Sequence, residues 1–213
     1  MEKIIVKLQD EEKSFLTKTL MCKEIFIQPT ETEPYYYKKC VFEDESVHQN
    51  ELQTSKHKNH FYIHRWGTKQ SDSYKGGNRA SLDFVVSDET DTYYSYLIRS
   101  AIINGELIIG PNKVLRKIKE VCHLNEKELE NVPIKLVSNK NDYDVLFSKR
   151  INLTKGFIDY KLRAVLCDEN FKNSKYPLKE NMVVDFIKQN NMSHDRAIEY
   201  AKDKLGYIPS SIK

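Results

Sequence analysis

Apolar residues along most of this chain come in short runs bounded by Gly, Pro, Asn and Asp, a pattern that predicts β-strands. Residues 59–66 (NHFYIHRW), 81–86 and 93–103 are the clearest of these runs. Asn104-Gly105 follows the third run directly and is a typical tight-turn pair, so a β-hairpin is expected there. Further short strands are expected over 24–28, 134–137, 145–147 and 162–166.

Apolar residues at helical spacing occur near the start of the chain and again in its second half. Residues 11–20 carry Phe15, Leu16 and Leu20 at such spacing and predict a helix. Gly110-Pro111 introduces a second segment (NKVLRKIKEVCHL), which predicts an amphipathic helix. Its apolar stripe consists of Val114, Leu115, Ile118 and Val121 or Cys122.

The tail after Pro177 differs from the strand-rich region before it. One apolar patch there consists of Val183, Val184, Phe186 and Ile187. Ser193 is placed to cap a further helix that carries Ala197, Ile198, Ala201 and Leu205. Strands and helices do not alternate as in βαβ units, so we expect an α+β fold with a mostly antiparallel, curved β-sheet and flanking helices. The predicted organisation is a single domain over 1–176 and a C-terminal helical extension over 177–213.

Composition places the chain among globular proteins, with 213 residues, 39% hydrophobic and 31% charged. A net charge of +3 permits a nucleic-acid partner without requiring one.

The four cysteines have no spacing that suits zinc, so free thiols are expected. No run of eighteen apolar residues and no signal-like N-terminus is present, so we expect no membrane span and a cytoplasmic location, nucleoid-associated or nuclear. Walker, HExxH and GxSxG motifs are absent, and we expect no metal and no organic cofactor.

Candidate chemistry begins with the stretch IQPTETEPYYYKKCVFEDESVH, in which acidic residues flank a cluster of tyrosines. Arg99 lies within an apolar run, and a buried guanidinium requires a carboxylate partner. Glu33 is the natural candidate for that partner. Such a pair has a structural interpretation, and it also suits general-base catalysis.

Five segments, in this order, give the chain a resemblance to a known family. They are ETEPY (31–35), DESVH (44–48), FYIHRWG (61–67), YLIRSAIINGELIIGPNKVL (96–115) and KRINL (149–153). Together they resemble the alkyladenine (3-methyladenine) DNA glycosylase family, which carries E-T-E-A-Y, D-x-A-x-H, Y-V-Y-x-x-Y-G, V-L-[IL]-R-A followed by a G-P-x-K-L helix start, and P-R-I-G-L. The resemblance covers roughly 31–166. It implies a monofunctional glycosylase that acts on damaged bases in double-stranded DNA.

The resemblance also assigns roles residue by residue. Glu33 falls on the catalytic glutamate, and Arg99 falls on the arginine next to the catalytic water. The implied base pocket consists of Tyr35, His48, Ile63 and Asp83. Trp66 takes the place of the tyrosine that is wedged into the DNA. Apart from these roles, the basic residues near the presumed wedge strand and its loop, together with Lys113 of the G-P-x-K match, are candidate contacts to the DNA backbone; they are Lys56, Lys58, Arg65, Lys69, Lys75, Arg79 and Lys113.

Three positions depart from the family pattern. Pro34 replaces an alanine, Ile63 replaces a stacking ring, and Asp83 replaces an amide with a charge, which changes what the pocket can bind. The physical reading is that aromatic rings stack on a base that has been flipped out of the duplex while an ionised carboxylate activates water.

Other interpretations stay open. The tyrosines can cover a core, His48 can be a solvated surface residue, and Trp66 can be a core residue. A catalytically silent module that reads modified bases is one functional alternative. A hydrolase of nucleosides or of N-glycosidic bonds in RNA is another. A monomer is expected in each case.

Overall fold

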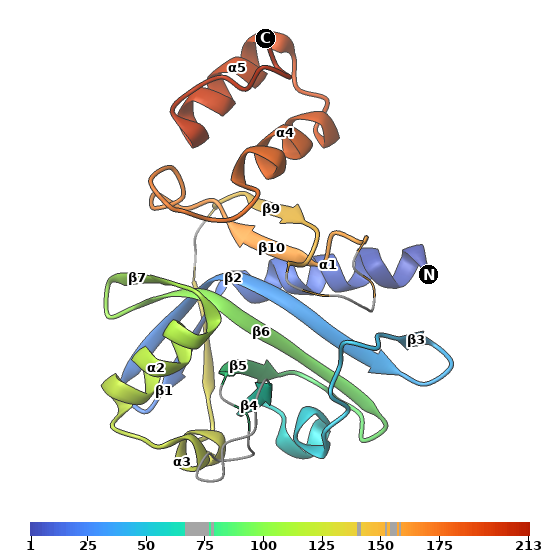
Figure 1. Cartoon of the computed structure of the whole chain (residues 1–213), viewed down its shortest axis with the longest axis vertical. Helices are drawn as coiled ribbons and strands as arrows, with labels where there is room; N and C mark the ends of the chain where they lie inside the picture. Colours follow the sequence, from blue (N-terminus) through green and yellow to red (C-terminus); the bar gives the residue numbers. More distant parts are fainter. Residues whose placement is uncertain (67–76, 78, 140–141, 152, 154–156, 158) are drawn as a thin grey trace.

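The computed structural model describes residues 1–66, 77, 79–139, 142–151, 153, 157 and 159–213. Within these residues five α-helices and a ten-stranded sheet form an α+β fold (Figure 1). All strand pairs are antiparallel. The predicted fold class and sheet type are therefore confirmed.

The centre of the sheet is a long pair of strands, β2 (Ile25–Lys38) and β6 (Thr92–Ile103), which run side by side in Figure 1. The main order is β4-β5-β6-β2-β1-β8. The other strands of this path are β1 (Lys18–Cys22), β4 (Phe61–Trp66), β5 (Arg79–Val85) and β8 (Lys135–Ser138). The strands off this path are β3 (Phe42–Glu43), β7 (Glu106–Ile109), β9 (Val145–Ser148) and β10 (Arg163–Leu166).

One irregularity in β2 positions the acidic residues of the site. The register with β6 shifts between Pro29 and Glu31 and again between Glu31 and Thr32. On its other edge β2 pairs first with β1 and then with β10, where Thr32 lies opposite Ala164. Proline cannot donate a hydrogen bond to the ladder, and irregularities of this kind re-aim side chains. Residues 29–35 are all buried, because strands lie on both edges of this segment.

Two predicted boundaries at the start of the chain are wrong. The first helix, α1, spans Glu2–Leu16 instead of 11–20, because its buried face starts with Ile5 and Leu8. Leu20 belongs to β1 instead. The strand predicted over 24–28 continues to Lys38, because the tyrosines that follow pair along β6. The predicted strands further along the chain and the hairpin turn at Asn104-Gly105 are present.

The helices predicted in the second half are present. They are α2 (Pro111–Cys122), α4 (Lys179–Gln189) and α5 (His194–Leu205). Ser193 is the N-cap residue of α5, although its side chain makes no capping hydrogen bond. A short helix that the periodicity did not predict, α3 (Glu126–Asn131), begins with a capping box between Asn125 and Glu128.

The two largest hydrophobic clusters among the described residues pack helices against the sheet. The larger one lies between the sheet and helices α1 and α2, and includes Ile27, Phe84 and Ile118. The second joins α4 and α5 to β9 and β10, with Leu146 and Val165 packed beside residues of the two helices. In Figure 1 these helices lie beyond β9 and β10, at the end of the molecule away from β4 and β5. The C-terminal helices thus share a core with strands that precede residue 177.

Among the described helices, none has the length and the apolar composition that crossing a membrane requires.

Candidate functional site

Glu33 and Arg99 lie next to each other at the centre of the sheet. Glu33 is on β2 opposite Leu97 of β6, and Arg99 lies two residues further along β6. The Nη1 atom of Arg99 is 3.3 Å from Oε1 of Glu33, and the glutamate is completely buried. The structure therefore brings together the two residues to which the sequence assigned catalysis.

Besides Arg99, two further groups contact the Glu33 carboxyl. The backbone N–H of Ile151 donates a hydrogen bond to Oε1 at 3.3 Å, and the Tyr35 hydroxyl donates one to Oε2 at 3.4 Å. Burial raises the pKa of Glu33, while the positive charges of Arg99, Arg150 and Arg163 oppose the rise. A raised pKa makes the ionised carboxylate a stronger acceptor of a proton from water.

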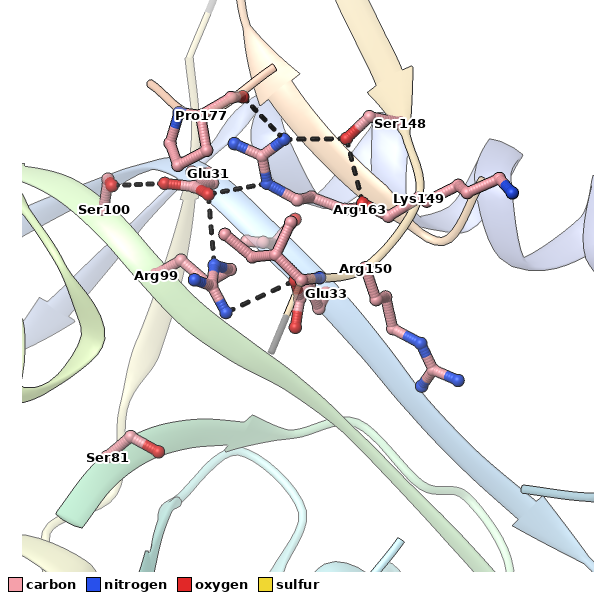
Figure 2. A network of polar contacts seen from close by, with 12 residues as sticks. Glu31, Glu33, Ser81, Arg99, Ser100, Ser148, Lys149, Arg150, Arg163 and Pro177 are labelled. Atoms are coloured by element: carbon pink, nitrogen blue, oxygen red, sulfur yellow. Dashed lines mark hydrogen bonds and ion pairs between the residues drawn. The ribbon is translucent and has the colours of Figure 1, made fainter. Parts of the chain in front are cut away.

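A second buried carboxylate, Glu31, shares Arg99 with Glu33 (Figure 2). Its Oε1 lies 3.1 Å from Arg99 Nε and 2.7 Å from Arg163 Nε, and its Oε2 accepts a 2.6 Å hydrogen bond from the Ser100 hydroxyl. Arg163 also donates to the hydroxyl of Ser148 at 2.7 Å. Two carboxylates and two guanidinium groups thus hold one another in place.

Sequence reasoning missed the structural roles of Glu31 and Arg163. Both left a signal, since Glu31 is two residues before Glu33 on one strand, and Arg163 interrupts an apolar run as Arg99 does. Buried arginines in apolar strands require carboxylates, and two such arginines indicate two partners.

A cavity of about 610 Å³ opens beside this network. Its wall includes Tyr35, His48, His64, Trp66, Asp83 and Arg99. Glu33 itself is not part of the wall. It contacts three wall residues, namely Tyr35, Arg99 and Ile151, so it lies directly behind the surface of the cavity.

His64 is the central ring of the wall, and sequence reasoning did not single it out. Its ring centroid lies 4.9 Å from His48, 5.2 Å from Trp66 and 6.5 Å from Tyr35. The alternation of β4 places His64 and Trp66 on the same face of the strand. Counting alternate positions from Trp66 would have identified His64.

The expected position of Ile63 in the base pocket is wrong. Its side chain is completely buried in the main hydrophobic cluster, beside Phe61 and Leu82. Successive residues of a strand point to opposite faces, so Ile63 cannot share the cavity with its neighbour His64. His48, Tyr35 and Asp83 do line the cavity, as expected for pocket residues.

Trp66 lies at the end of β4 with 38% of its surface exposed, which contradicts the core interpretation. It lines the main cavity and also a second hollow formed with Arg79 and Lys113. Arg79 and Lys113 are both exposed. An aromatic ring flanked by two cations therefore lies at the mouth of the cavity.

The other basic residues predicted to contact DNA differ in whether they are already paired within the protein. The assignment of Arg65 as a DNA contact is wrong, because Arg65 pairs with Glu126 and donates a hydrogen bond to the Gly77 carbonyl at 3.1 Å. Only 12% of its side chain is exposed. Lys56 and Lys58 form surface ion pairs with Glu51 and Asp88. Lys69 and Lys75 lie outside the described residues.

Arg150 supports the cavity from behind, and the sequence had pointed only to the segment that contains it. Its Nη1 is 2.6 Å from Asp44 Oδ2, and its guanidinium carbon is 5.3 Å from the centroid of the Tyr35 ring. Arg150 and Asp44 are both buried. This pair connects two segments of the resemblance, 44–48 and 149–153, and fixes the ring of Tyr35 between them.

Within the described part of the chain, no group of three or more His, Cys, Asp or Glu residues is arranged to hold a metal ion. The sequence matches no protein-family model, and no curated protein is a significant match to it.

Proposed function

We propose that this protein is a DNA repair glycosylase that flips a damaged purine, alkylated or deaminated, out of duplex DNA and hydrolyses its N-glycosidic bond. One observation carries the proposal, which is that the Glu33–Arg99 pair lies directly behind an aromatic cavity of about 610 Å³. Tyr35 and Arg99 belong both to the cavity wall and to the surroundings of Glu33. A base held in this cavity has its sugar next to the carboxylate.

The aromatic wall supports binding of a flipped base. The rings of Tyr35, His48 and His64 offer flat faces, and each stacking contact with a base contributes about 1–3 kcal/mol. Trp66 at the mouth is placed to fill the gap that the extruded nucleotide leaves in the duplex. Arg79 and Lys113 beside it offer charges for the phosphates that flank this gap.

Glu33 supports the hydrolytic step. Cleavage of the bond builds positive charge on the sugar, and an ionised carboxylate both stabilises that charge and accepts a proton from the attacking water. The positive charge of Arg99 favours the ionised form of Glu33, while burial favours the protonated form. The product is an abasic site, and no cofactor is needed.

The second candidate is a catalytically silent module that reads modified bases. The full burial of Glu33 favours it, because burial limits the access of water to the carboxylate. The cavity and the exposed Trp66 serve a reader as well as an enzyme.

An excision assay separates these candidates. Duplex oligonucleotides that carry hypoxanthine, ethenoadenine or a methylated purine are incubated with the chain and then heated in alkali, which cleaves the strand at abasic sites. Cleavage that Glu33→Gln abolishes supports the glycosylase, with a loss of about 10²–10⁴-fold expected for a general base. Glu24→Gln is a matched control, because Glu24 is exposed and lies in the turn between β1 and β2, outside the site.

Three outcomes contradict the proposal. Lesion-selective binding without cleavage indicates the silent reader. Release from free nucleosides or RNA but not from duplex DNA indicates the other hydrolase. Cleavage by Glu33→Gln at the parent rate excludes Glu33 as the catalytic base.

A further inference from the structure

Asp83 lines the cavity with a carboxylate oxygen that accepts no hydrogen bond from the described residues. The residue is on β5 and only 1% exposed. Its Oδ2 accepts a 2.9 Å hydrogen bond from the Ser95 hydroxyl, which in turn accepts one from Gln53 Nε2 at 3.1 Å. Its Oδ1 accepts no hydrogen bond from any described residue. One oxygen is therefore fixed and the other is left for a ligand.

The nearest group to this free oxygen is the ring of His64. Its Nδ1 is 3.0 Å from Oδ1, an ion pair when the imidazole is protonated, but the two atoms do not form a hydrogen bond. The other ring nitrogen, Nε2, is 2.8 Å from the Ser81 hydroxyl. Asp83 Oδ1 thus keeps its acceptor capacity.

Ser81, His64 and Asp83 are neighbours and have the residue types of a hydrolytic triad, but their geometry does not support one. In such a triad the carboxylate accepts a hydrogen bond from Nδ1–H and so orients the imidazole. Here that bond is missing, and Ser81 is completely buried. The three side chains are better understood as part of the wall against which a ligand packs.

The charged residues of the cavity wall differ in their pairing and in their position. Of the described lining residues, Asp83 is the one carboxylate. Arg99 is already paired with Glu31 and Glu33, and Arg79 is exposed at the mouth. The interior of the cavity consequently combines a negative charge with aromatic rings, which is the environment that attracts cations.

We propose that Asp83 is a specificity-determining residue that selects a base carrying a positive charge and an N–H donor, such as a cationic alkylated purine, over a neutral base without that donor. The proposal rests on the glycosylase function proposed above. The Asp83 Oδ1 atom accepts the N–H in a charge-assisted hydrogen bond. A neutral base that presents a lone pair to the same oxygen is repelled, so rejection adds to the selectivity.

Binding of two duplexes tests the proposal without relying on catalysis. One carries 7-methylguanine, which is cationic and has N–H donors, and the other carries ethenoadenine, which is neutral and has none. A 2′-fluorine on each damaged nucleotide destabilises positive charge on the sugar and keeps the base attached. The variants are Asp83→Asn, which keeps the shape and loses the charge, and Asp91→Asn, an exposed control.

The parent chain should bind the cationic duplex at least tenfold more tightly than the neutral one, after each affinity is divided by that for undamaged duplex. Asp83→Asn should reduce this ratio about tenfold by weakening only the cationic complex, and Asp91→Asn should leave it unchanged. No preference in the parent chain, or an unchanged ratio in Asp83→Asn, overturns the proposal. If Asp83→Asn does not fold, the preference of the parent chain alone decides. Failure to cleave unfluorinated duplexes would contradict the glycosylase function while leaving this binding result valid.

Discussion

Arg99 Nη1 lies 3.3 Å from Oε1 of Glu33, in a position where neither side chain is more than slightly exposed. The same guanidinium holds Glu31 through Nε at 3.1 Å. Its planar fork can contact two carboxylates at once, which an ammonium group cannot do with the same geometry. The ionisation of Glu33 therefore depends on how Arg99 is shared between its two partners.

We predict that Arg99→Lys lowers base release about 10–100-fold and moves the acid limb of the pH–rate profile to higher pH. Burial already raises the pKa of Glu33, and the positive charge of Arg99 lowers it, so a poorly placed charge leaves the pKa higher. Base release requires the ionised form and so rises with pH through this pKa. The measurement is single-turnover release between pH 5 and 9.

Arg116→Lys is the control for this substitution, since Arg116 is exposed on α2. An acid limb in Arg99→Lys that coincides with that of the parent chain would show that Arg99 does not set the pKa of Glu33.

The sequence predicted the fold class and most strands because their periodicity is local. It did not predict that β2 continues through the ETEPY motif, because buried carboxylates in a strand contradict its usual composition. Only the tertiary partners Arg99 and Arg163 make them tolerable there. Contacts between distant segments of this kind cannot be read from periodicity.

The pairing of Glu33 with Arg99 was predicted because a buried charge requires an opposite one, which is a physical rule that needs no structure. Their catalytic roles came from the resemblance and stay a prediction. Ile63 was misplaced and His64 was missed because the resemblance was applied position by position. The alternation of β4 decides which of two neighbours faces the cavity, and a shift of one residue exchanges them.

A further buried carboxyl, Glu12 of α1, makes stability depend on pH. It is completely buried, the Thr32 hydroxyl donates to its Oε1 at 2.8 Å, and its Oε2 has no hydrogen-bond partner among the described residues. Burial is the main cause that raises its pKa well above the usual value, and the charge of Glu33 adds to the rise. We predict that Glu12→Gln is more stable than the parent chain at pH 8.

The direction of this stability difference follows from the coupling between protonation and folding. A pKa raised by folding contributes stability that is present below the unfolded-state pKa and is lost as pH rises through the folded-state pKa. Glutamine does not titrate, so the advantage of Glu12→Gln should grow with pH, by about 1.4 kcal/mol for each pH unit within that window. Denaturant melts at pH 5, 6.5 and 8 measure the difference. An advantage that is the same at all three pH values would contradict the explanation.

Trp66→Ala should weaken binding to an abasic duplex by about 1–3 kcal/mol, the value of one base–aromatic stack. Its partial exposure at the end of β4 means that the melting temperature should change little, whereas truncating a buried Trp costs about 3–5 kcal/mol. Release of a well-paired lesion should slow more than release of a mismatched one, because extruding a paired base costs more.

Phe26→Ala provides the matched control, since Phe26 is also exposed but lies at the start of β2 and not in the cavity wall. Equal binding losses in the two variants would show that Trp66 has no special contact with DNA.

Arg79 and Lys113 should contribute to DNA binding through phosphates, and Arg65 should not. The first two are exposed beside Trp66, so Arg79→Gln and Lys113→Gln should each reduce the salt dependence of duplex affinity by roughly 0.9 in the logarithmic slope. Arg65 is engaged by Glu126 and the Gly77 carbonyl, so Arg65→Gln should leave the slope unchanged. It should instead lower stability by about 1.5–3 kcal/mol, the range for hydrogen bonds to charged groups.

Titrations between 50 and about 300 mM salt, with a melt of each variant, measure both effects. A slope that falls in Arg65→Gln but not in Arg79→Gln would place the DNA on the α3 side of the sheet, away from the cavity, and would contradict the binding mode proposed here.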